Sequence, residues 1–208
     1  MINNKTKKGF TLLELLIVIA ILAILGAIVI FLLNPAETLK KARDSQRISD
    51  LSTIKTALGI YLTSVSSPVI DAYGSCASNV WYSLNGVTDT SVAGSEAATS
   101  TATAAELGEV DGTGWIPVNL SSLVGGSPIS SFPIDPSNTI TSLSAIANTD
   151  LVYRYTCSST PMGFEIDAAL ESDAFTSTDD KRAKDGGNHT TLYEVGTSLT
   201  ILPGTNDF

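Results

Sequence analysis

The first residue that suggests chemistry is Glu14, a carboxylate within a long run of apolar side chains. It lies five residues after Gly9, in the stretch KKGFTLLELLIVIAILAILGAIVIFLL that covers residues 7–33. A carboxylate placed in hydrocarbon costs roughly 3 kcal/mol unless a partner neutralises it. The position of Glu14 therefore needs a functional or structural reason.

Two further sets of side chains have the types that bind one another or a metal. Outside the cytoplasm, Cys76 and Cys157 most simply form a disulfide, and two separate buried thiols are the alternative. Asp179, Asp180 and Asp185 form an oxygen-rich segment of the kind that holds Ca²⁺. Lysine and arginine side chains lie among these aspartates, which favours a solvated loop, so no metal is expected.

The rest of the composition argues against catalysis and against nucleic-acid binding. The sequence has no GxSxG, CxxC, HExxH or phosphate-binding glycine motif. Its single histidine, His189, lies in a polar stretch typical of a surface. No enzyme activity and no cofactor are therefore expected. The formal net charge is −9, whereas nucleic-acid binding needs clustered lysine and arginine, so no specific nucleic-acid binding is expected.

The elements that position these residues begin with a segment that can span a membrane. Residues 15–33 are 19 residues without a charge. As a helix they approach the length of roughly 30 Å that a bilayer core requires. A buried core helix is disfavoured because a soluble domain of this size needs no helix that is apolar on every side. A cleaved signal peptide is disfavoured because no two small residues have the spacing of its cleavage site.

The second element is an amphipathic helix over residues 35–62. Asn34–Pro35 is expected to interrupt the helix, because proline removes a backbone donor and disfavours helix at the residue before it. Beyond it, apolar side chains recur at spacings of three and four and form one stripe, namely Ile48, Leu51, Ile54, Leu58 and Tyr61. The mixed charges of residues 40–50 lie mainly off this stripe and are expected to be solvated.

The remaining residues, 63–208, predict a globular head of the α+β class. Apolar and polar side chains alternate over residues 151–157 and 164–171, which predicts the two strands of an antiparallel hairpin. Residues 192–195 are expected to add a third strand, giving a sheet at about residues 151–195. Residues 80–84 are a short strand or a loop anchor. Residues 88–114 form a loop rich in Ser, Thr, Ala and Gly, in which the alanines of 97–107 favour a short helix.

The order of elements at the N-terminus resembles the class III signal of type IV pilins and pseudopilins. The shared elements are a short basic leader, Gly9, Phe10, a glutamate five residues into the mature chain and a long apolar helix. A looser resemblance, carried by PIDPSN, YRYT and GFEIDAALES, extends to the sheet. The resemblance implies the type IV pilin-like fold. In that fold a long N-terminal helix, with a membrane half and an amphipathic half, packs on an antiparallel β-sheet.

The resemblance also implies how the N-terminus is processed. Residues 1–9 would be a leader, prepilin peptidase would cleave between Gly9 and Phe10, and Phe10 would then be N-methylated. Because that peptidase acts on the cytoplasmic side, the N-terminus would be cytoplasmic, and residues 10–34 would cross the inner membrane once and later drive polymerisation. Glu14 is expected to pair with the Phe10 amine of a neighbouring subunit. The alternative is that Glu14 reaches the membrane interface and matters only to the peptidase.

The function that the resemblance implies is that of a structural subunit of an extracellular type IV pilus or related filament on the cell surface. The expected partners are copies of the same chain in a helical filament, prepilin peptidase, the inner-membrane pilus assembly machinery and, before assembly, membrane lipid. One alternative is a pseudopilin of a type II secretion system. Another is a membrane-anchored binding protein that never polymerises, although a plain anchor needs no carboxylate at Glu14.

Overall fold

The structure is a computed structural model that describes residues 9–72, 76, 79–84, 97–98, 102–138, 140 and 146–204. The chain divides into two units, Met1–Leu39 and Lys40–Phe208. The lysines of the predicted leader and the first part of the predicted Ser/Thr-rich loop lie outside the described residues.

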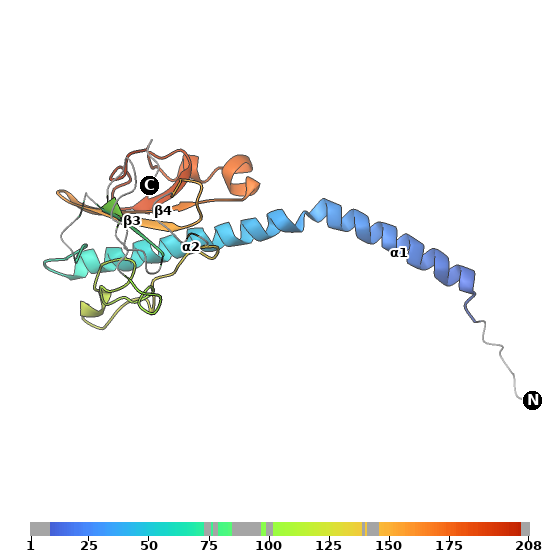
Figure 1. Cartoon of the computed structure of the whole chain (residues 1–208), viewed down its shortest axis with the longest axis horizontal. Helices are drawn as coiled ribbons and strands as arrows, with labels where there is room; N and C mark the ends of the chain where they lie inside the picture. The colour runs from blue at the N-terminus through green and yellow to red at the C-terminus, as the bar shows by residue number, and fades with distance from the viewer. Residues whose placement is uncertain are drawn as a thin grey trace, which may run out of the picture. The chain divides into compact units, whose positions relative to one another are not determined.

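The first unit contains helix α1, Leu12–Leu33, and the first turn of helix α2, Pro35–Ser64 (Figure 1). Between the two helices, Asn34 has a φ of 38°, in the left-handed region that commonly ends helices. Its Oδ1 atom accepts a hydrogen bond from the Glu37 N–H (3.4 Å). Pro35 occupies the first position of α2, where a missing N–H has little cost. The predicted interruption at Asn34–Pro35 is confirmed, and Asn34 ends one helix while it caps the next.

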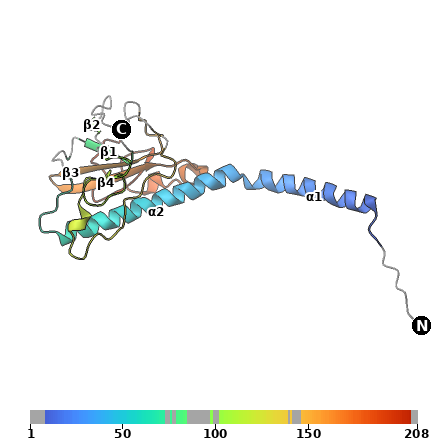
Figure 2. The same ribbon diagram turned by 60° about the horizontal axis from the view of Figure 1, so that its bottom comes forward.

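In the second unit, the remainder of α2 lies along one face of a β-sheet (Figures 1 and 2). Four strands are antiparallel in the order β1-β3-β4-β5, and the short β2 pairs parallel with β1. The α+β prediction and the predicted hairpin are therefore confirmed. The strands are β1 Asn79–Tyr82, β2 Ala97–Ala98, β3 Tyr153–Ser159, β4 Met162–Ala169 and β5 Leu192–Gly196. Short helical turns are Leu120–Ser122, Ala174–Thr178 and Arg182–Lys184.

The main core lies between α2 and the sheet. From α2 it takes Leu51, Ile54, Leu58 and Tyr61, which are four of the five stripe residues, and all are at most 4% exposed. The fifth, Ile48, is half-buried. They pack against a row of sheet side chains that includes Trp81, Tyr153, Tyr155, Phe164, Ile166 and Val195. Each buried aliphatic side chain of this kind contributes about 2 kcal/mol, so the stripe is what holds α2 on the sheet.

The opposite face of the sheet is buried as well. Alternation of apolar and polar side chains is typical of a sheet with one solvated face, yet Arg154, Glu165 and Asp167 on β3 and β4 are at most 1% exposed. A second apolar cluster covers this face, with Val80, Tyr82, Val152, Leu192 and Leu202 among its members. The segment after β5 supplies Leu202 to this cluster.

The prediction of a short helix over residues 97–107 is wrong for the residues of this range that the structure describes, 97–98 and 102–107. Ala97–Ala98 forms β2 instead. Residues 102–107 form turns, in which the Glu106 N–H donates to the Thr103 carbonyl (3.0 Å). The Glu106 carboxylate accepts hydrogen bonds from Thr103 N–H and Oγ1 (3.1 and 2.8 Å), a local arrangement that competes with helix.

Candidate processing and assembly site

The N-terminus of α1 is fixed by a reciprocal pair of hydrogen bonds between Thr11 and Glu14. The Thr11 hydroxyl accepts from the Glu14 N–H (3.2 Å), and the Glu14 carboxylate accepts from the Thr11 N–H (3.5 Å). Together these bonds form a capping box, which satisfies backbone donors that a helix end otherwise leaves unpaired. The carboxylate is thus held in the first turn, at the positive end of the helix dipole.

The peptide bond between Gly9 and Phe10 precedes this cap and is open to contact. The Phe10 side chain is 82% exposed. A methyl group built on Gly9 would meet no atom within 4 Å. Since glycine also has no side chain of its own, another protein's active site can approach this backbone closely.

Helix α1 presents apolar side chains on every side. None of Leu12–Ile30 is buried, and this stretch is long and apolar enough to cross a membrane. Among the described residues, no lysine or arginine forms an ion pair with Glu14. The site therefore combines an accessible peptide bond, a carboxylate able to accept a cation and a helix that needs an apolar environment.

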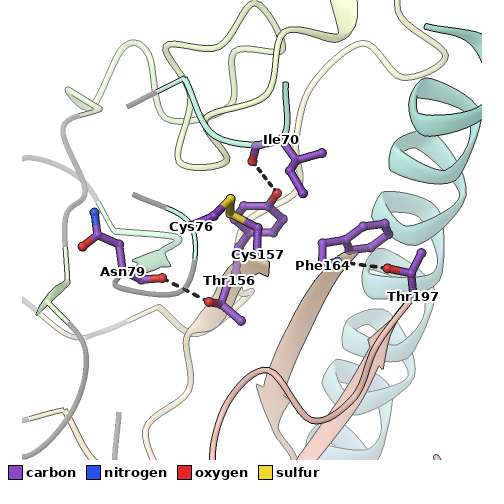
Figure 3. Close-up of a disulfide and its surroundings, with 8 residues drawn as sticks. Ile70, Cys76, Asn79, Thr156, Cys157, Phe164 and Thr197 are labelled. Carbon is purple, nitrogen blue, oxygen red and sulfur yellow. Dashed lines mark hydrogen bonds between the residues drawn. A yellow bond between two sulfur atoms is a disulfide. The ribbon is translucent and has the colours of Figure 1, made fainter. Parts of the chain in front are cut away.

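Cys76 and Cys157 are joined by a disulfide in the head (Figure 3). Hydrogen bonds from the two residues that precede Cys157 hold β3 against the chain that follows α2. The Tyr155 hydroxyl donates to the Ile70 carbonyl (2.7 Å), and the Thr156 hydroxyl donates to the Asn79 carbonyl (3.1 Å).

The three aspartates considered for calcium do not share a centre in the part of the chain that the structure describes. Asp179 pairs with Lys181 and Lys184, whose hydrogen bonds lower the pKa of Asp179 to about 2. Asp180 pairs with Arg182 (2.9 Å). The Asp185 carboxylate accepts the N–H groups of Gly187 and Glu194 (both 2.9 Å) and so turns toward its own loop. Asp179 and Asp180 are thus paired with basic side chains of their own loop.

The charges near the start of the amphipathic helix are not all solvated, contrary to expectation. Asp44 and Arg47 are fully buried. The Arg47 guanidinium donates to Asp135 (2.7 and 3.1 Å), Asp44 (2.7 Å) and Glu171 (2.8 Å). The Asp44 carboxylate also accepts the N–H groups of Glu171 and Ser172. This Arg47 cluster links α2 to the loop before β3 and to the segment after β4.

Two other sets of polar residues differ from expectation. His189 is 5% exposed rather than on the surface, and its Nδ1 accepts the N–H groups of Thr191 and Leu192 (both 3.2 Å). The sequence reasoning also missed three carboxylates that meet on the second face of the sheet. These are Glu165, Asp167 and Glu194, each 1% exposed. Burial raises the pKa of Glu165 to about 8 and that of Asp167 well above its ordinary value.

One signal for these carboxylates was present in the sequence. Glu165 and Asp167 are two residues apart on a predicted strand, so they must point to the same face. What the sequence did not indicate is that this face is covered by the C-terminal segment.

Comparison with known proteins bears on the N-terminal segment. Residues 4–30 match the family model described as the prokaryotic N-terminal methylation motif. The match spans Gly9, Phe10 and Glu14 and most of α1. No curated protein and no solved structure shows significant similarity to the chain. The chain thus carries the N-terminal methylation motif, the class III signal typical of type IV pilins and pseudopilins, and it has a pilin-like α+β fold in which a capped, exposed apolar helix is followed by a helix packed on an antiparallel sheet.

Proposed function

We propose that the chain is a structural, non-enzymatic subunit of an extracellular type IV pilus or related filament. It is inserted in the inner membrane with its N-terminus in the cytoplasm, and prepilin peptidase cleaves it between Gly9 and Phe10. The Phe10 amine is methylated. The assembly machinery then moves the subunit from the membrane into a helical filament of copies of itself.

The observation that carries this proposal is the combination of Glu14 with the fully exposed surface of α1. An apolar helix of this kind needs lipid before assembly and other subunits afterwards. Cleavage after Gly9 makes the nitrogen of Phe10 an amine that is charged near neutral pH. In a filament, Glu14 of one subunit pairs with the Phe10 amine of its neighbour. Two charges that are each costly in an apolar environment thereby offset one another. Their pairing also sets the offset between neighbouring subunits along the filament axis.

The first experiment replaces Glu14 by Ala in the producing cell. The variant is expected to reach the membrane normally, whereas the yield of sheared filaments falls by about tenfold or more if each contact loses about 1.4 kcal/mol. Immunoblots of membrane and sheared fractions measure both quantities. Glu109→Ala is the matched control, because Glu109 is an exposed glutamate of the head and its loss should leave both fractions unchanged. A normal filament yield from Glu14→Ala would remove the pairing argument.

The second measurement is the N-terminal mass of the exported chain, which should begin at a methylated Phe10. An exported chain that still begins at Met1 would contradict the processing. Electron microscopy of the sheared fraction separates the alternatives. Surface filaments that contain this chain support the pilus, short periplasmic polymers support a type II secretion pseudopilin, and a monomeric membrane protein supports the non-polymerising binding protein.

A further inference from the structure

A row of buried polar side chains crosses the second face of the sheet, away from α2. Direct cross-strand pairing brings Tyr82 opposite Arg154, Arg154 opposite Asp167 and Asp167 opposite Glu194. Glu165 lies two residues before Asp167 on β4 and so points to the same face. The chain thus places one arginine and three carboxylates side by side in its interior.

The two glutamates are each half satisfied by backbone donors. Glu165 Oε2 accepts the N–H groups of Ile201 and Leu202 (2.7 and 3.1 Å). Glu194 Oε2 accepts the N–H of His189 (2.8 Å). These bonds hold both carboxylates in place through Oε2. They do not involve Oε1 of either glutamate.

Four carboxylate oxygens in this cluster have no hydrogen-bond partner. They are Glu165 Oε1, Glu194 Oε1 and both oxygens of Asp167. Asp167 is 1% exposed, so no bulk water replaces the missing partners. One oxygen from each of the three residues lies within 4.8 Å of the others. A buried acceptor without a partner costs about 1–3 kcal/mol, and more when it is charged, so the three oxygens that lie close together favour a cationic partner.

The charge of the cluster indicates how much positive charge is missing. Arg154 is fully buried beside Asp167, but its guanidinium donates to the carbonyls of Val152 and Ala147 (3.0 and 2.8 Å). No hydrogen bond joins Arg154 to the unpartnered oxygens of Asp167. When all three carboxylates are ionised, the cluster with Arg154 has an excess of two negative charges, which one divalent cation neutralises.

We propose that Glu165, Asp167 and Glu194 bind a structural Ca²⁺ ion in the interior of the head. All the donor atoms are carboxylate oxygens, which hard cations prefer, and soft metals that select thiolate or imidazole have no suitable ligand there. Asp167 offers both oxygens and each glutamate offers one, and water completes the shell of about six to eight ligands that Ca²⁺ takes. This site differs from the exposed loop of Asp179 and Asp180. It does not depend on whether the chain forms a filament.

The backbone around the cluster closes over it. A methyl group built on Gly187 would fall 1.8 Å from Glu194 Oε2, so the loop before β5 lies directly against this carboxylate. The segment at Ile201 and Leu202 lies against Glu165, to which it donates two backbone N–H groups. The ion is therefore enclosed as the head folds, and it fixes the C-terminal segment to the sheet.

The test uses the full chain in a non-ionic detergent after extensive dialysis against EGTA. Thermal unfolding is followed by the fluorescence of the buried Trp81 and Trp115. Addition of about 5 mM CaCl₂ near neutral pH should raise the midpoint by about 5 °C or more, as expected for a site of roughly 0.1 mM affinity. Elemental analysis of protein purified in Ca²⁺ should give one calcium per chain. Tb³⁺ luminescence sensitised by nearby aromatic side chains, Tyr82 among them, should appear and be displaced by Ca²⁺.

Matched variants locate the ion. Asp167→Asn and Glu194→Gln should each abolish the calcium-dependent shift, and Asp167→Asn should be at least as stable as the parent chain in EGTA because it removes a buried charge. Asp179→Asn should keep the full shift, and if it abolishes the shift instead, the ion sits in the loop and the proposal is wrong. No shift and no bound calcium in the parent chain would show that the carboxyls are held by shared protons. An equal shift with Mg²⁺ would overturn the assignment to calcium.

Discussion

At the scale of single residues, the buried Arg47 cluster is the strongest constraint on how α2 meets the head. A guanidinium has five donors, and Arg47 directs them at Asp135, Asp44, Glu171 and the Ser137 hydroxyl. Such a cluster contributes little net stability compared with apolar packing. Removing any one partner is nevertheless strongly destabilising, because it leaves a buried charge unpaired. Its main effect is to fix the register of α2 on the sheet, because a shift of one helical residue would leave a buried charge unpaired.

The same cluster predicts an acid-dependent loss of stability. Hydrogen bonds from Arg43 (2.6 and 2.7 Å) and from Arg47 lower the pKa of Glu171 to about 2. In the unfolded chain this pKa is about 4.3, so the native state holds Glu171 ionised and gains stability above that value. As the pH falls from about 4.5 to about 2, the chain should lose about 2–3 kcal/mol of its free energy of unfolding through this group.

Urea unfolding at a series of pH values measures this loss. Glu171→Gln should be less stable than the parent chain near neutral pH, and the two should converge toward about pH 2, where Glu171 itself is protonated. Asp44 and Asp135 also face Arg47 and are present in both chains, so the comparison isolates Glu171. The exposed Glu109→Gln is the control and should follow the parent chain throughout. A constant difference between Glu171→Gln and the parent chain over this range would refute the assignment.

At the scale of elements, local patterns in the sequence predict the helices and strands but not what covers them. The apolar run, the Asn34–Pro35 pair and the period-two alternation each act within a few residues, and the structure follows them. The buried state of Arg47 depends on Asp135 and Glu171, which lie 88 and 124 residues away. Charged side chains are rarely buried without partners. Because the partners of Arg47 are distant in the sequence, the local pattern predicts a solvated side chain instead.

The predicted disulfide has an element-scale consequence, because it ties the segment after α2 to β3. Its cysteines are 81 residues apart, and closing a loop of that length contributes about 4.5 kcal/mol in the chain-entropy model. The double variant Cys76→Ala, Cys157→Ala should therefore unfold at a lower urea concentration, with a loss of about 4 kcal/mol. Reduction of the parent chain should have a similar effect, and adding reductant to the double variant should have none. Equal unfolding midpoints for reduced and oxidised parent chain would contradict the prediction.

At the scale of the whole molecule, the two units differ in what they need from their surroundings. The first unit presents α1 with no buried side chain over Leu12–Ile30. The second unit holds both apolar clusters, the Arg47 cluster, the disulfide and the buried carboxylates. Stability of the head is thus internal to residues 40–208, whereas α1 exposes an apolar surface that favours an apolar environment. Under the proposed function, this division allows α1 to move from the membrane into a filament while the head stays folded.

The division predicts where the chain can be cut. A fragment of residues 40–208 keeps every buried cluster of the head, so it should be soluble without detergent and unfold within about 1 kcal/mol of the full chain in detergent. A fragment of residues 49–208 keeps the apolar stripe from Leu51 onward but lacks Arg43, Asp44 and Arg47. It leaves Asp135 buried without its arginine, which should lower the free energy of unfolding by about 3–5 kcal/mol. Size-exclusion chromatography and urea unfolding of both fragments measure these effects. Aggregation of the longer fragment, or equal stability of the two, would show that the boundary of the head lies elsewhere.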